Sequence, residues 1–319
     1  MFEKTVPALS VRDMYEDFKV SGRVDNARVE KFAGAEGYDV YNPSVPFMWE
    51  GREYIAGRVE KRDTELSEVR FFVREGDVWR AAEGTVRLPL QDPFVTFVGG
   101  KLVLGGVNVT FPEVEGGDTC WQTDFYIGSP FGLEKFLEGP KQMKDVRLAE
   151  LPDGKIAVCS RPQGASMEKY GCIAKIGFTV VNGLGELTAD VIENAPFLEK
   201  MFKDDEWGGV NQLTVLKNGK LGAIGHKACR TYEADGQRLH YYGIAFAIDP
   251  VTREITQNKM IVSRDRFPET EKKRFDLGDI TFTSGVLRGE DGTARVFTGL
   301  NDAYVGSAVI PDPFAEYEK

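Results

Sequence analysis

Residues 213–225 read LTVLKNGKLGAIG: an apolar run, the pair Asn218-Gly219, and a second apolar run. An Asn-Gly or Asp-Gly pair between two apolar runs is the strongest short-range signal for a β-hairpin. The same plan occurs in four further stretches, SVPFMWEGREYIAG (44–57), FVTFVGGKLVLGG (94–106), VRLAELPDGKIAVCS (146–160) and GVLRGEDGTARVFTG (285–299). The sequence therefore predicts five similar hairpins, with turn glycines at Gly51, Gly100, Gly154, Gly219 and Gly292.

The turn glycines lie about 50 to 70 residues apart, a spacing typical of four-stranded propeller blades lengthened by insertions. Further strands are expected at 68–73, 173–180 and 241–248. Helical periodicity is confined to 1–18, 131–137 and 195–202, which we interpret as insertions or a terminal cap. We predict an all-β fold: a single five-bladed β-propeller domain over residues 1–319, with 1–34 as an N-terminal extension packing on it. A β-sandwich with coincidental hairpins is the alternative.

Composition limits the kinds of partner. The formal net charge is -10, and non-specific binding to nucleic acid or to anionic membrane would need basic patches. The first 20 residues lack the pattern of a signal peptide, and no apolar stretch approaches the roughly 20 residues that span a bilayer. The four cysteines have no CxxC spacing, as expected of free thiols in a reducing compartment. We expect a cytoplasmic protein that binds neither nucleic acid nor membrane.

Histidine is rare, with only two in the chain, so a multi-histidine zinc site is disfavoured, and we expect neither a metal nor an organic cofactor. Polar residues instead recur at the ends of the predicted hairpins. Because a first strand begins where its antiparallel partner ends, these positions should gather at one end of every blade. Counting back from each turn glycine reaches the positions of Asn42, Asp92, Asp145, Asn211 and Ser284. Counting forward reaches the positions of Arg58, Val107, Arg161, His226 and Gly299, with Asn108 and Asp302 nearby.

The residues of such a ring could supply a general acid and a phosphate-binding site. Asp92 precedes Pro93 and is a candidate general acid, with a turn-forming Asp as the alternative. Lys144, Arg161, Lys175 and His226 form a candidate cationic cluster that would bind phosphate, with separate surface salt bridges as the alternative. Trp121 and Trp207 are candidates for stacking on sugar rings.

With these residues in view, the sequence resembles five-bladed propellers that act on β-mannosides. One branch is the β-mannoside phosphorylases of glycoside hydrolase family 130. The closer branch is the mannosyltransferase-phosphorylases of glycosyltransferase family 108, formerly a domain of unknown function. The resemblance covers roughly residues 35 to 314. It rests on the motifs YNP (41–43), GRVE (57–60) with RD (62–63), QDP (91–93), MKDVR (143–147), SRPQG (160–164), KIG (175–177), WGGVN (207–211), GH (225–226), SG (284–285) and GLND (299–302).

The resemblance assigns roles position by position. It implies that Asp92 is the general acid, that Asn42, Arg58, Asp145 and Asp302 hold the reacting mannose, and that Lys144, Arg161 and His226 bind phosphate; we extend that last set to Lys175. The phosphorylase branch usually has Glu-Asp-Pro-Arg at the acid, whereas this chain has Gln91-Asp92-Pro93-Phe94.

The implied reaction is inverting phosphorolysis of a β-1,2-linked mannoside, which yields α-mannose 1-phosphate and is reversible. Phosphate is the co-substrate, and mannose oligosaccharides or mannose 1-phosphate are the partners. The resemblance also implies that the proton passes through a sugar hydroxyl. Three alternatives stay open: a GDP-mannose-dependent β-1,2-mannosyltransferase, a β-mannoside hydrolase, and a non-catalytic carbohydrate-binding propeller.

Overall fold

A computed structural model describes residues 2–112 and 117–319. Nearly all regular structure in these residues is β-strand, as predicted, and the α-helices are α1 (Val11–Ser21) and α2 (Ala189–Glu193). Each of the five predicted turn glycines lies between two paired antiparallel strands and has a positive φ, from 73° at Gly100 to 81° at Gly154. This left-handed backbone is the conformation that a residue without Cβ adopts at no steric cost. The five hairpins are therefore confirmed.

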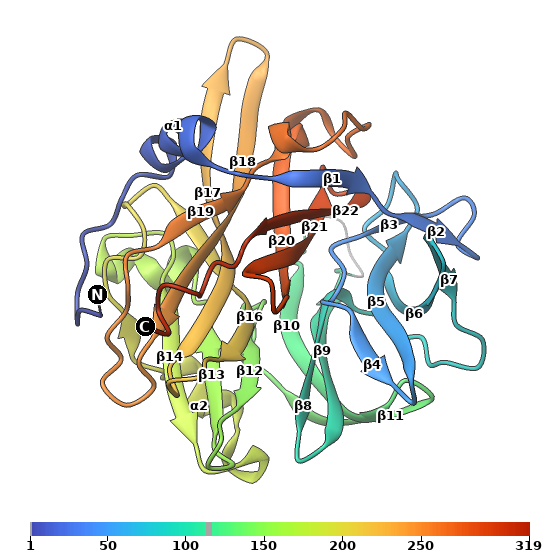
Figure 1. Cartoon of the computed structure of the whole chain (residues 1–319), viewed down its shortest axis with the longest axis horizontal. Coiled ribbons are helices and arrows are strands. Elements are labelled where there is room, and N and C mark those ends of the chain that lie inside the picture. Colours follow the sequence, from blue (N-terminus) through green and yellow to red (C-terminus); the bar gives the residue numbers. More distant parts are fainter. Residues whose placement is uncertain (1, 113–116) are drawn as a thin grey trace.

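Three sheets follow one another along the chain (Figure 1). The first contains β2 (Lys31–Ala33), β3 (Asp39–Tyr41), β4 (Phe47–Trp49), β5 (Arg52–Glu60), β6 (Glu68–Glu75) and β7 (Val78–Ala81). The second contains β8 (Gln91–Val98), β9 (Lys101–Thr110), β10 (Cys120–Ser129) and β11 (Gly132–Glu138). The third contains β12 (Arg147–Glu150), β13 (Ile156–Ser160), β14 (Ile176–Val181) and β15 (Phe197–Leu198).

The fourth sheet has eight strands and divides into two antiparallel groups. One group contains β16 (Trp207–Val215), β17 (Leu221–Glu233), β18 (Gly236–Ile248) and β19 (Lys259–Val262). The other contains β20 (Asp279–Arg288), β21 (Thr293–Leu300), β22 (Tyr304–Pro311) and β1 (Asp25–Val29). A short parallel pairing of β18 with β20 joins them. The β17–β18 hairpin extends beyond the rest of the molecule (Figure 1).

The apolar core lies between successive strand groups, and the order of packing closes on itself. Phe71 of β6 packs with Leu104 of β9, and Phe125 of β10 with Val158 of β13. The third group packs against β16–β19 together with α1, and β16–β19 packs in turn against β20–β22. Finally Phe297 of β21 packs with Trp79 of β7, which returns to the first sheet. Each fully buried large apolar side chain of this kind contributes about 1.5–3 kcal/mol.

The start of the chain takes part in two sheets. β1 completes the group of β20–β22 by pairing with β22, and β2 pairs in parallel with β7. Glu30, between these two strands, is buried and accepts hydrogen bonds from Arg74, Arg295, Ser307 and Trp79 at 2.5–3.0 Å. Residues 25–33 are thus built into the sheets, while α1 packs on the core that the third and fourth groups share.

The helical predictions were only partly correct. Helix α1 begins at Val11 and replaces the predicted 1–18, and most of the predicted 131–137 belongs to strand β11 (Gly132–Glu138). A bulge in β11, where Leu137 pairs with Phe125 but Lys135 pairs with Tyr126, puts both Phe136 and Leu137 against the core. The resulting spacing of Leu133, Phe136 and Leu137 imitates a helix. The helix expected at 195–202 is instead α2, capped by Thr188, and 197–198 is strand β15. None of the helices in residues 2–112 and 117–319 is both long and apolar enough to cross a membrane.

Candidate active site

The first strand of each hairpin is irregular where the sequence predicts a polar ring. Asn42, Asp92 and Asp145 have φ of 41°, 48° and 57°, the left-handed region that non-glycine residues rarely adopt. The pairing of β16 with β17 shifts register at Asn211, and that of β20 with β21 shifts at Ser284. Each irregularity turns a polar side chain out of the sheet. We call Asn42, Asp92, Asp145, Asn211 and Ser284 the ring residues.

Two ring residues, together with near neighbours of the other three, line one cavity. A volume of about 230 Å³ is lined by Asn211 and Ser284 themselves, by Pro43 and Pro93, which follow Asn42 and Asp92, and by Arg147, which follows Asp145 by two positions. Residues from every first strand therefore reach the same space, as the repeat predicts.

Asp92 is buried and held by two other predicted residues. Its Oδ1 accepts hydrogen bonds from Asn42 Nδ2 at 2.9 Å and from Arg58 Nη1 at 3.2 Å. Gly299 packs directly on Asn42, since a Cβ at that glycine would lie 1.8 Å from Asn42 Oδ1. The close approach of β21 therefore requires glycine, and it fixes the amide that holds the carboxylate.

A second layer of buried charge supports Arg58. Its guanidinium donates to Glu60 and Glu65, and Lys273 contacts both of these carboxylates. Tyr41 donates to Glu60 at 2.5 Å. Burial alone would lower the pKa of Arg58, but Asp92, Tyr41 and Glu60 raise it well above its usual value. Arg58 therefore carries a fixed positive charge beside Asp92.

Asp302 lies at the turn between β21 and β22, with φ of 52°. Burial and the nearby charge of Asp92 raise its pKa, while Arg58 and Lys273 oppose that rise. Asp302 thus shares the electrostatic surroundings of Asp92 and Arg58, as predicted.

Asp145 forms the centre of a second cluster. Arg161 Nη1 pairs with its carboxylate, and Arg147 Nη2 lies 3.5 Å from it. Burial would raise the pKa of Asp145, but Arg161, Arg147 and Lys144 together lower it. Gly209 makes room for Arg161, because a Cβ there would lie 2.8 Å from Arg161 Cδ. The cluster combines one carboxylate with three cationic side chains, so it retains net positive charge.

His226 lies fully buried beside this cluster. Its Nδ1 is 2.8 Å from Asn211 Oδ1, and its ring stacks on Tyr241 with centroids 5.5 Å apart. Burial, with Arg161, Lys144 and Arg147 adding to it, lowers the pKa of His226 well below its usual value. The imidazole is therefore neutral at pH 7 and can donate or accept a hydrogen bond without a charge.

Several buried polar atoms of the ring have no hydrogen-bond partner among the described residues. They are Asn42 Oδ1, Asn211 Nδ2, His226 Nε2 and Ser284 Oγ. An unpaired buried polar group costs about 1–3 kcal/mol. Their concentration here indicates a place built for a polar ligand.

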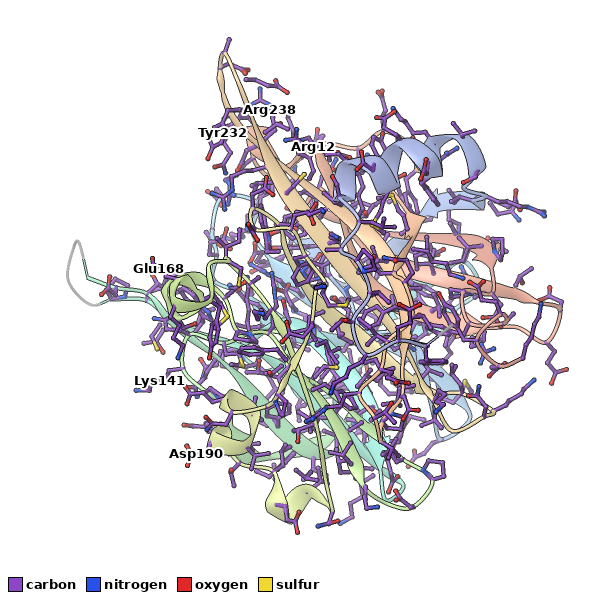
Figure 2. The ribbon with its side chains drawn as sticks, turned by 90° about the vertical axis from the view of Figure 1, so that its left-hand side faces the viewer. Arg12, Lys141, Glu168, Asp190, Tyr232 and Arg238 are labelled. Carbon is purple, nitrogen blue, oxygen red and sulfur yellow. The ribbon has the colours of Figure 1, made fainter. Side chains whose placement is uncertain are left out.

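A larger cavity of about 820 Å³ borders the cationic cluster. Its lining includes Lys144, Arg161, Trp207 and Tyr241, with Trp121 on the facing side. Arg230 and Leu239 of the β17–β18 hairpin form another wall. Figure 2 shows Tyr232 and Arg238 near the tip of this hairpin, beyond the body of the molecule. Trp121 and Trp207 both line this cavity next to the predicted phosphate ligands, but Trp207 is buried and the Arg230 guanidinium lies over its ring.

Lys175 is the predicted residue that the structure does not bring into the cluster. Its Nζ lies 3.4 Å from Glu199 Oε2 and over the rings of Tyr170 and Phe197. A phosphate-binding role for Lys175 stays a prediction without a supporting contact.

Sequence reasoning omitted three residues from the site. Arg147 could have been found, because it follows Asp145 by two positions and so lies on the same side of the strand. Nothing in the sequence marks Lys273 as a site residue, because it belongs to the charged stretch ETEKKR (269–274), which resembles an exposed loop. Tyr241 was predicted only as part of an outer strand. Within residues 2–112 and 117–319, no three His, Cys, Asp or Glu side chains gather as metal ligands would.

Comparison with known proteins agrees with this arrangement. A family model described as "Protein of unknown function (DUF1861)" matches residues 16–316. A mannose phosphorylase of Leishmania mexicana, MPT-4, solved in complex with a phosphate ion, is 35% identical, with 97% of this chain and 95% of that chain covered and a TM-score of 0.89. A GDP-Man-dependent mannosyltransferase from the same organism, MPT-1, is 32% identical, with 97% and 96% covered and a TM-score of 0.88.

A more distant likeness concerns the fold alone. A β-1,2-mannobiose phosphorylase from Listeria innocua is 14% identical, with 89% of this chain and 93% of that chain covered and a TM-score of 0.60. A search of curated proteins finds no match. Because the family model spans nearly the whole chain, and two solved relatives exceed 30% identity over the same length, this protein belongs to the DUF1861 family and is a relative of mannose-processing enzymes.

Proposed function

We propose that this protein catalyses reversible, inverting phosphorolysis of β-1,2-linked mannosides, yielding α-mannose 1-phosphate. The observation that carries the proposal is that Arg147 feels the charge of both Asp92 and Asp145 and so links two clusters. One is the carboxylate of Asp92, held by an amide and a guanidinium, and the other is the net-cationic group around Asp145. Phosphate is already an anionic nucleophile, so one acid and a cationic binding site are sufficient. The similarity to the phosphate-bound mannose phosphorylase supports the same conclusion.

In this proposal Asn42, Arg58, Asp145 and Asp302 hold the mannosyl ring whose anomeric carbon reacts. Lys144, Arg161 and the open Nε2 of neutral His226 bind the phosphate. A phosphate oxygen forms the new bond to the anomeric carbon as the glycosidic bond breaks. The leaving oxygen takes a proton that originates from Asp92 and travels through a sugar hydroxyl.

Hydrolysis is less well supported by the same geometry. Inverting hydrolysis needs a second carboxylate free to activate water. Asp145 is occupied by Arg161 and Arg147, and its lowered pKa makes it a weak base.

Transfer from GDP-mannose is the second candidate. Lys144 and Arg161, which line the 820 Å³ cavity, would contact a diphosphate, and Trp121 in the same lining offers a ring on which a base could stack. The 32% identical mannosyltransferase favours keeping this alternative.

We also propose that the five strand groups are the five blades of a single propeller domain over residues 1–319. The closed order of core packing and the pairing of β1 with β22 support this interpretation. The propeller-like arrangement would place the ring residues around its axis.

The test is to incubate the protein with β-1,2-mannobiose, with and without phosphate, and separately with GDP-mannose. Phosphate-dependent release of mannose 1-phosphate is the expected result. Phosphate-independent release of mannose would show a hydrolase, and transfer from GDP-mannose alone would show the second candidate. Inertness in all three assays would favour a sugar-binding protein without catalysis.

A further inference from the structure

A second groove adjoins the acid through Gln91 and shares no lining residue with the 820 Å³ cavity at the cationic cluster. It has a volume of about 540 Å³ and is lined by Gln91, the residue before Asp92, and by Glu65, whose carboxylate contacts Arg58. Gln91 Nε2 also donates to the backbone oxygen of Glu65 at 3.1 Å. The groove wall is therefore tied to the residues that hold Asp92. We call this feature the Gln91 groove.

The chemistry of its lining suits a neutral sugar chain. Tyr38, Leu66 and Phe111 line the groove and are 42%, 72% and 41% exposed, which is high for apolar side chains. The charged residues beside them are Glu65, Glu68 and Arg87, which would repel a nucleoside diphosphate more than attract it. Aromatic faces next to polar groups are the arrangement on which sugar rings stack.

Reaction geometry decides which end of the substrate lies here. In an inverting displacement the nucleophile and the leaving group are on opposite faces of the reacting sugar. The cationic cluster of Lys144 and Arg161 opens to the 820 Å³ cavity, so the nucleophile enters from that side. The Gln91 groove has no lining residue in common with that cavity and adjoins Asp92 through Gln91, which makes it the candidate path for the leaving chain.

We infer that the Gln91 groove binds the acceptor portion of a mannose oligosaccharide, beyond the sugar at the scissile bond. This inference rests on the proposed function for the direction of the chain. It assigns Tyr38 and Phe111 as specificity-determining residues for chain length.

The test compares binding of β-1,2-mannotetraose and β-1,2-mannobiose by calorimetry in the absence of phosphate. Phe111→Ala and Tyr38→Ala should each weaken tetraose binding about tenfold and change mannobiose binding less than twofold. Phe131→Ala is the matched control, because Phe131 is 47% exposed on a turn outside the groove. It should change neither affinity. Arg230→Ala, in the other cavity, should also leave tetraose binding unchanged.

Failure of the groove and failure of the reaction give different results. Unchanged tetraose binding in Phe111→Ala and Tyr38→Ala, or a selective loss in Arg230→Ala instead, overturns the groove and leaves phosphorolysis standing. Loss of tetraose binding in the two groove variants, with no mannose 1-phosphate formed by the wild type, keeps the groove and overturns the reaction. A wild-type protein that binds neither sugar overturns both.

Discussion

The molecule contains two buried polar clusters that differ in how completely they are paired. Around Glu30, where β1 joins β22, the carboxylate accepts bonds from Arg28, Arg74, Arg295, Ser307 and Trp79. Around the ring, Asn42, Asn211, His226 and Ser284 each keep a buried atom without a partner among the described residues. The first cluster is complete without a ligand and the second is not. Buried polarity thus stabilises the fold in one place and prepares a binding site in the other.

The largest expected effect tests the ring. Asp92→Asn keeps an oxygen that Asn42 and Arg58 can still contact, so the fold should persist. Phosphorolysis should fall by about 10³-fold or more, because the proton donor is lost. Steady-state rates and a thermal melt of the same sample are the measurements. Asp249→Asn, at a turn with Lys220 as partner, is the control and should retain activity. Near-normal turnover in Asp92→Asn would remove this residue from the mechanism.

The next largest effect tests the polar cluster around Glu30. Burial would raise the pKa of Glu30, but hydrogen bonds from Ser307, Arg74 and Arg28 lower it to about 2 from a usual 4.5. The difference corresponds to about 3 kcal/mol of stability, present above pH ~4.5 and lost as pH falls toward 2. Glu30→Gln should lose about that much free energy of unfolding at pH 7 in a urea titration.

The pH series sharpens this prediction. The gap between wild type and Glu30→Gln should narrow as pH falls below about 4.5. Glu16→Gln, at an exposed surface pair with Lys19, should change stability by less than about 0.5 kcal/mol at any pH. A gap that stays constant down to pH 3 would contradict the role of the ionised carboxylate.

A third prediction concerns His226. Replacing it with Gln should raise KM for phosphate about 10- to 100-fold with a smaller effect on KM for the mannoside, because Nε2 no longer reaches the anion. Since burial lowers its pKa, the unfolded chain binds the proton first as pH falls below about 6.5. Wild-type stability should therefore decline on going from pH 7 to pH 5, and His226→Gln should decline less.

The chain's other histidine provides the comparison for that variant. His240 is partnered on both nitrogens, by Thr231 and Asp279 at 2.8 Å. His240→Gln should leave KM for phosphate unchanged. Equal effects of the two substitutions would argue against a specific phosphate contact at His226.

The smallest expected effect again contrasts the two clusters. Ser284→Ala removes a buried hydroxyl that has no partner among residues 2–112 and 117–319, so the free energy of unfolding should not fall. Ser307→Ala removes a hydroxyl bonded to Glu30 at 2.5 Å and should cost about 1.5–3 kcal/mol. Paired urea titrations compare them; equal losses would contradict the distinction drawn here.

Local signals in the sequence were enough for the repeated part of the molecule. Glycine-containing turns between apolar runs, three of them Asn-Gly or Asp-Gly, depend only on neighbouring residues, so the five hairpins and the ring residues could be predicted from them. Asn42 and Arg58 contact Asp92, Arg161 contacts Asp145, and His226 lies beside Asn211 and near Arg161. Each of these residues lies at a similar distance from its turn, which is why the sequence could place them together.

The insertions could not be predicted in the same way. Their positions depend on partners far along the chain: Lys273 reaches Glu60 over 213 residues, and Lys175 turns to Glu199 instead of the ring. The bulge in β11 spaces its apolar residues as a helix would, and no local sequence pattern tells the two structures apart. The cavities could not be predicted from the sequence either, because such insertions and the β17–β18 hairpin form their walls.

The pairing of β1 with β22 has a consequence for how this chain folds during synthesis. The Ser307–Glu30 contact joins residues 277 positions apart. β1 therefore leaves the ribosome well before its partner strand β22 is synthesised. The four earlier strand groups can form before this pairing exists, but the contacts of β1 with β22 wait until β22 has been synthesised. The site depends on the geometry of the finished circle, so activity should appear late, after most secondary structure is already in place.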